Sequence, residues 1–280
     1  MLAALMGMAS APLFAQLVTT GPVTNGHHHF IVSDIDEHLR FWVDTLGGTP
    51  DTLGADPGLT IIKFPDALVA LREGTPTGGM VGTSVDHVAF TVPNLREMVD
   101  RLVAAGHEMV TAGTAPPGLE VVDGIARVDD GPVSGFAHAL GPDSIKVELL
   151  EINAQQQPIV SHHIHFYGAD PEAMRDWYAD MFGAEPQPGP LPTIFTAALP
   201  GLALNFTRYD DPLSGTRGRA LDHIGFEVDD LEAFCAELES RGIEFDIAYR
   251  MVEEIDTAIA FLTDPWGTYI ELTEGLDNVQ

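Results

Sequence analysis

Cysteine and basic residues are scarce in this 280-residue chain, and each scarcity excludes something. The single cysteine, Cys235, cannot form an internal disulfide, and its position within the predicted helix 231–241 favours a buried thiol over a nucleophile. Thirteen lysine and arginine residues stand against 42 aspartate and glutamate residues, which gives a formal charge of −29. Nucleic acids and anionic membranes repel such a surface, so we expect neither as a partner.

Long apolar runs are also missing, because no stretch reaches the roughly 20 apolar residues that a membrane-spanning helix needs. The first fifteen residues, Met1–Ala15, are apolar and small and resemble the hydrophobic and cleavage regions of a signal peptide, without its basic region. We therefore expect residues 1–24 to be a signal peptide or a disordered arm. A signal peptide would make the protein periplasmic or secreted, and the alternative is a cytoplasmic protein.

One sequence unit is present four times. The stretch Gly26–Asp34 leads into a helical pattern at Ile35–Gly47, and Ser161–Asp170 leads into a matching pattern at Pro171–Gly183. In both, an aspartate stands at the expected N-cap and a glycine at the expected C-cap.

The other two copies open with an Asp-His pair. They begin at Val85–Val92 and Leu221–Val228, and each is followed by a helical pattern that ends in glycine. Short strand-like runs follow every helix, so the unit is β-α-β-β-β.

The spacing of the copies predicts how they combine. His27 precedes His87 by 60 residues, and His163 precedes His223 by the same interval. We therefore predict two tandem domains of two units each, residues 25–152 and 160–275, joined by the polar stretch Asn153–Pro158. The predicted fold class is α+β, with four βαβββ modules and curved mixed sheets around a metal cleft.

Histidines and glutamates at matching strand positions form two candidate metal sites. Because side chains two residues apart share one face of a strand, the histidines that open paired units can point into one cleft, where a glutamate of the last strand joins them. The predicted ligand sets are His27, His87 and Glu148 in the first domain, and His163, His223 and Glu271 in the second.

Two imidazoles and one carboxylate make a facial triad that leaves up to three positions of an octahedral ion open. Fe²⁺, Mn²⁺, Zn²⁺ or Ni²⁺ could occupy it, one ion per competent domain. A small-molecule substrate with two adjacent oxygens could chelate such an ion. His29 and His165 lie two residues beyond predicted ligands on the same strand face, and we expect them to act as general bases or to support the site through hydrogen bonds.

The chain resembles the vicinal-oxygen-chelate (VOC) superfamily, which contains glyoxalase I, fosfomycin-resistance proteins, methylmalonyl-CoA epimerase and extradiol ring-cleaving dioxygenases. The resemblance extends from His27 to Glu274. It is carried by the histidine ahead of a Val-x-Asp turn and by the endings Pro142–Glu148 and Pro265–Glu271.

The resemblance implies a metal-dependent lyase or isomerase of the glyoxalase type. Two departures leave alternatives open. Ala70 and Asn205 stand where glyoxalase I-like sites have a further carboxylate, and Phe261 stands where extradiol dioxygenases have a tyrosine, with His138 in the same slot of the first domain. An extradiol-type dioxygenase and a non-catalytic binding or resistance protein are the alternatives, as a monomer or a homodimer.

Overall fold

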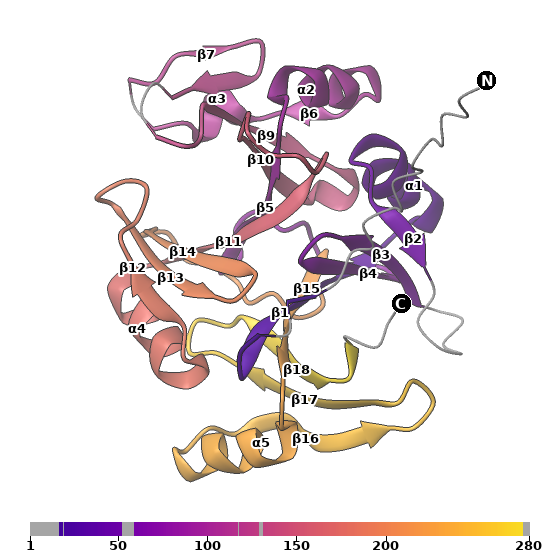
Figure 1. Cartoon of the computed structure of the whole chain (residues 1–280), viewed down its shortest axis with the longest axis vertical. Helices are drawn as coiled ribbons and strands as arrows, with labels where there is room; N and C mark the ends of the chain where they lie inside the picture. The colour runs from indigo at the N-terminus through magenta and orange to yellow at the C-terminus, as the bar shows by residue number, and fades with distance from the viewer. Residues whose placement is uncertain (1–16, 19, 52–58, 117, 129–130, 277–280) are drawn as a thin grey trace, which may run out of the picture.

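The computed structural model describes residues 17–18, 20–51, 59–116, 118–128 and 131–276 (Figure 1). Of residues 1–24, which the sequence suggests as a signal peptide or a disordered arm, residues 1–16 and 19 lie outside these ranges, whereas Val23 and Thr24 belong to the first strand. Within the described ranges, none of the helices has the length and apolar character needed to cross a membrane.

The chain folds into the four predicted units, each of which opens with a strand and a helix. Unit 1 contains β1 (Val23–Val32), α1 (Ile35–Leu39), the π-helix η1 (Arg40–Thr45), β2 (Thr49–Asp51), β3 (Leu59–Phe64) and β4 (Ala67–Glu73). Unit 2 contains β5 (Val85–Val92), α2 (Leu95–Ala104), β6 (Glu108–Met109), α3 (Thr111–Thr114), β7 (Val121–Val122), β8 (Ile125–Arg127), β9 (Gly135–Leu140), the 3-10 turn η2 (Pro142–Ser144) and β10 (Lys146–Glu151).

The second half of the chain repeats this order with fewer additions. Unit 3 contains β11 (Val160–Gly168), α4 (Pro171–Phe182), β12 (Glu185–Gln187), β13 (Ile194–Leu199) and β14 (Leu202–Arg208). Unit 4 contains β15 (Leu221–Val228), α5 (Leu231–Ser240), β16 (Phe245–Val252), β17 (Thr257–Thr263) and β18 (Tyr269–Glu274).

Local sequence signals set where the helices begin and end. The predicted caps Asp34 and Asp170 each accept a backbone N–H three residues on, from Glu37 and Ala173, which confirms both. Gly183 ends α4 in the left-handed conformation, at a φ of 71°, where a side chain would be strained.

Two curved mixed sheets carry the fold, and the predicted α+β class is confirmed. One sheet has eight strands in the order β16-β17-β18-β15-β1-β4-β3-β2, and the other has ten, with β12-β13-β14-β11-β5-β10-β9-β8-β7 as its main path. Within each unit, the first strand pairs in parallel with the last.

The partners within each sheet differ from the predicted ones. Strand β1 pairs antiparallel with β15, and β5 pairs antiparallel with β11, so unit 1 shares a sheet with unit 4 and unit 2 with unit 3. The sheets therefore do not follow the predicted division at residues 25–152 and 160–275, because each takes strands from both ranges.

Units 1 and 2, and likewise units 3 and 4, meet through their apolar faces instead. Trp42 of unit 1 packs on Phe90 of unit 2 with 6.2 Å between ring centroids, and Phe182 of unit 3 packs on Phe226 of unit 4 at 5.0 Å. The four units thus form a ring in which sheet pairing alternates with core packing (Figure 1).

Candidate metal centres

The strand alternation of β1 separates two kinds of histidine. His28 and Phe30 are fully buried, and His28 lies in register with the core residues Val69 and Ile224. His27 and His29 point to the opposite face of the sheet. Irregular pairing with β15 flanks this segment on both sides, as it does around His163–His165 on β11. Such irregularities re-aim side chains next to functional sites.

Site 1 consists of His27, His29, His223 and Glu271. Nε2 of His27 and Nε2 of His223 each lie 2.9 Å from the same carboxylate oxygen, Oε2 of Glu271. Gly225 makes this meeting possible because it lies in register between His27 and Glu271. A Cβ at that position would overlap the imidazole of His27.

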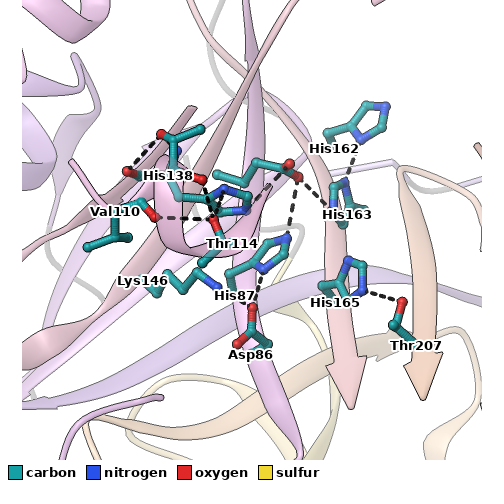
Figure 2. A network of polar contacts seen from close by, with 12 residues as sticks. Asp86, His87, Val110, Thr114, His138, Lys146, His162, His163, His165 and Thr207 are labelled. Carbon is teal, nitrogen blue, oxygen red and sulfur yellow. Dashed lines mark hydrogen bonds and ion pairs between the residues drawn. The ribbon is translucent and has the colours of Figure 1, made fainter. Parts of the chain in front are cut away.

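Site 2 consists of His87, His163, His165 and Glu148 (Figure 2). Nε2 of His87 and Nε2 of His163 lie 3.3 and 3.2 Å from Oε2 of Glu148. Here Ala89 stands in register between His163 and Glu148, the place that Gly225 has in site 1.

The predicted grouping of ligands is therefore wrong, although the six predicted residues do gather in two sets of three. His27 lies with His223 and Glu271, and His163 lies with His87 and Glu148. The cause is the exchange of sheet partners, because ligands on neighbouring strands belong to units from different halves of the chain.

An aspartate orients one histidine in each site. Nδ1 of His87 lies 2.7 Å from Asp86, and Nδ1 of His223 lies 2.6 Å from Asp222. A carboxylate only accepts, so each Nδ1 carries the hydrogen and Nε2 is the nitrogen that faces the glutamate. The sequence analysis missed both aspartates, although the Asp-His pair that opens units 2 and 4 is a signal for them, since a carboxylate behind a ligating histidine is common at metal centres.

Charge at each site is balanced by these contacts. Burial by itself raises the pKa of the Glu271 carboxyl, but its contacts with His223 and His27 outweigh burial and hold that pKa well below its usual range. Burial lowers the pKa of His87, yet its contacts with Asp86 and Glu148 outweigh burial and raise that pKa. Each glutamate therefore stays ionised among the imidazoles.

These residues fit a divalent metal ion. Ligands on adjacent positions of an octahedral ion, each about 2.1 Å from it, lie about 3 Å apart, which matches the separations between imidazole nitrogen and carboxylate oxygen at both sites. Nε2 of His87 and Nε2 of His163 are buried and make no hydrogen bond with the described residues. A buried nitrogen lone pair that faces a carboxylate oxygen is unfavourable without a cation or a proton between them.

His29 and His165 belong to the same clusters. One ring nitrogen of each lies within 4.8 Å of nitrogens of two other histidines, His27 and His223 in site 1, and His87 and His163 in site 2. His29 stacks on His223 with 4.3 Å between ring centroids. In site 2, Nε2 of His165 lies 2.8 Å from the hydroxyl of Thr207 (Figure 2).

The two slots expected to lack a carboxylate lie beside these histidines. Ala70 pairs in register with His29, and Asn205 pairs with His165. The Asn205 side chain accepts a hydrogen bond from Thr196 at 2.8 Å. The described part of each site therefore has a single carboxylate in contact with its imidazole Nε2 atoms.

Comparisons with known proteins agree with this geometry. Residues 160–272 match the family model of the Glyoxalase/Bleomycin resistance protein/Dioxygenase superfamily. No curated protein matches the chain in sequence.

Solved structures of glyoxalase I have the same fold. Glyoxalase I from Zea mays shares 17% identity at a TM-score of 0.67, over 91% of this chain and 94% of that one. A mutant of the same maize enzyme gives 16% identity and a TM-score of 0.69, over 92% of this chain and 95% of that one. At these identities the likeness concerns the fold alone. Residues 160–272 thus match the model of this superfamily and the chain as a whole has the fold of glyoxalase I, so the resemblance to the VOC superfamily is confirmed at the level of the fold.

Proposed function

We propose that the protein is a metal-dependent lyase or isomerase with two active sites, acting on a small substrate that presents two adjacent oxygens. The observation that carries this proposal is the convergence, twice in one chain, of two imidazole nitrogens and one carboxylate oxygen from neighbouring buried strands. His27, His223 and Glu271 would hold the ion at site 1, and His87, His163 and Glu148 at site 2. A bound Fe²⁺, Mn²⁺, Zn²⁺ or Ni²⁺ ion would supply Lewis acidity toward the substrate oxygens.

The protein's own residues keep the ligands in position. Asp86 accepts the Nδ1 hydrogen of His87, and the ammonium group of Lys146 lies 2.5 Å from the same carboxylate. In site 1, Asp222 holds His223 and also accepts the backbone N–H of Gly218 at 2.5 Å. Fixing the ring nitrogen and its orientation in this way raises the basicity of the opposite nitrogen.

Proton transfer in this proposal belongs to His29 and His165. Because the Thr207 hydroxyl occupies Nε2 of His165, Nδ1 is the nitrogen left to take a proton from a substrate carbon next to the chelated oxygens. Ala70 and Asn205 stand beside these histidines and supply no carboxylate. In this proposal the imidazoles therefore act as the base in place of a carboxylate. His165 is buried and His29 is half-buried, which limits the access of competing water to the reacting atoms.

Metal content tests the proposal directly. We expect the purified protein to take up roughly two divalent ions per chain, Glu148→Gln and Glu271→Gln roughly one each, and the double variant none. A wild-type protein that binds none of the four metals after dialysis against each would contradict the proposal and favour a metal-free binding protein.

Replacement of the proposed bases separates their role from metal binding. We expect His29→Asn with His165→Asn to retain both ions and to lose turnover by about 10²-fold or more, the usual contribution of a positioned base. Turnover would be followed on a panel of 2-hydroxycarbonyl compounds. Loss of the bound ions together with turnover would indicate that His29 and His165 are metal ligands and not general bases.

An extradiol-type dioxygenase is the second candidate, favoured by one observation. Two histidines and one carboxylate with open positions are typical of non-heme iron oxygenases, and no second carboxylate stands at Ala70 or Asn205. Oxygen consumption with catechols and Fe²⁺ separates the two candidates, because a lyase or isomerase turns over equally well under argon.

A further inference from the structure

Site 2 contains an imidazole that site 1 lacks. On β9, His138 stands in register opposite Glu148, and on β17 the equivalent place opposite Glu271 is taken by Phe261. Both side chains are buried, so the two halves of the chain differ here in chemistry and not in position.

The His138 ring lies within ligand distance of the site. Its Nε2 is 3.5 Å from Oε1 of Glu148, the carboxylate oxygen that His87 and His163 leave free (Figure 2). Ligand atoms of His87, His138 and Glu148 all lie within 4.8 Å of one another. The carboxylate of Glu148 therefore has imidazoles on both of its oxygens.

Helix α3 fixes the orientation of His138. Oγ1 of Thr111 accepts its backbone N–H at 2.9 Å, and Oγ1 of Thr114 lies 3.0 Å from its Nδ1. The Thr114 hydroxyl also has the carbonyl oxygens of Val110 and Thr111 within 3.3 and 3.2 Å, and it has one hydrogen to give. With that hydrogen on a carbonyl, Thr114 accepts from Nδ1–H, and Nε2 presents its lone pair to the site.

We propose that His138 is a fourth protein ligand to the metal ion at site 2, so that the two sites differ in coordination. The inference rests on the proposed function, in which both sites bind metal. Of six octahedral positions, four protein ligands leave two and three leave three. Site 2 then accepts one bidentate substrate and nothing more, whereas site 1 accepts a bidentate substrate together with one further small ligand.

Reciprocal substitutions test this proposal, because His138→Phe makes site 2 like site 1 and Phe261→His makes site 1 like site 2. The probe is Co²⁺, titrated into apo-protein and followed by visible absorption and by competition with a chelator. We expect two affinity classes in the wild type. His138→Phe should weaken the tighter class by about 10-fold or more, since even partners outside the ligand set are worth that much. Phe261→His should tighten the weaker class.

Circular dichroism and the thermal midpoint serve as folding controls. If one of the two variants is unstable, the other still tests the proposal by itself. Unchanged Co²⁺ affinity and absorption in both variants would overturn the role of His138, while wild-type protein that still binds two ions would leave the proposed function standing. Wild-type protein that binds no Co²⁺ at all would overturn both the proposed function and the role of His138.

Discussion

Gly225 and Ala89 occupy equivalent places in the two sites, between a histidine on one neighbouring strand and a glutamate on the other. The missing side chain at Gly225 lets His27 approach Glu271 to 2.9 Å, while His163 lies 3.2 Å from Glu148 beside the methyl group of Ala89. The two sites thus differ by one methyl group at this position and by the distance between the histidine nitrogen and the glutamate oxygen.

Gly225→Ala should therefore weaken metal binding at site 1, because the new methyl group must displace the His27 ring. We expect roughly one metal ion per chain in place of two, measured by elemental analysis after dialysis. Ala89→Gly is the matched control and should retain both ions. Two tightly held ions in Gly225→Ala would contradict this account of the site.

His28 is a buried polar side chain that lies outside both candidate sites. It is fully buried, neither ring nitrogen has a hydrogen-bond partner among the described residues, and burial lowers its pKa to about 3, so the ring is neutral. The equivalent residue of unit 3 is Ile164, which is also buried.

His28→Ile should stabilise the protein by about 1–2 kcal/mol, because an unpaired buried N–H is removed and apolar contacts replace it. Urea denaturation at pH 7 measures the free energy of unfolding. Ile164→His is the reverse control and should destabilise by a similar amount. A loss of stability in His28→Ile would show that the imidazole contributes favourably to the core.

At the scale of elements, the last strand of unit 2 supports its own helix. Oε1 of Glu151, at the end of β10, accepts the N–H of Leu95 in the first turn of α2 at 2.9 Å. Its Oε2 accepts from Ser134 at 2.8 Å and pairs with Arg127. Burial raises the pKa of the Glu151 carboxyl, but these donors outweigh burial and lower it.

Glu151→Gln should cost about 1–3 kcal/mol at pH 7, the range for hydrogen bonds to a charged group. The folded-state pKa is depressed, so this stabilisation is present above the unfolded value of about 4.5 and is lost as pH falls through the lower folded value. The difference from wild type in urea denaturation should therefore be constant from pH 7 to about pH 5 and should shrink as the pH falls below about 4.5. Glu274→Gln, which removes the charge from the equivalent hydrogen bond to Leu231, is the matched substitution in unit 4. A difference that stays constant with pH would contradict the role of the charge.

At the scale of the whole molecule, the ring of units decides which residues act together. Each sheet joins units from the two halves of the sequence, so each candidate metal centre depends on residues from both halves of the chain. His27 and Glu271 meet although 244 positions separate them.

Pairs of substitutions reveal this arrangement by counting metal ions. His27→Ala with Glu271→Gln removes two ligands of one site, so roughly one ion per chain should remain. His27→Ala with Glu148→Gln damages both sites, and we expect almost none. The reverse result would indicate that units pair in sequence order, as the spacing of the repeats predicted.

The sequence alone determined the repeated unit, its helix caps, the fold class and the six residues that gather at the candidate metal centres, because these depend on local patterns of polarity and on strand alternation. It also marked His29 and His165 by their position on the same strand face. Which unit faces which was decided only by the tertiary structure. The first strands of all four units are alike, so their hydrogen bonds can be satisfied equally well by either partner. The choice is made by the packing of apolar faces, such as Trp42 on Phe90 and Phe182 on Phe226. This packing joins unit 1 to unit 2 and unit 3 to unit 4, and leaves the first strands to pair between the two halves of the chain.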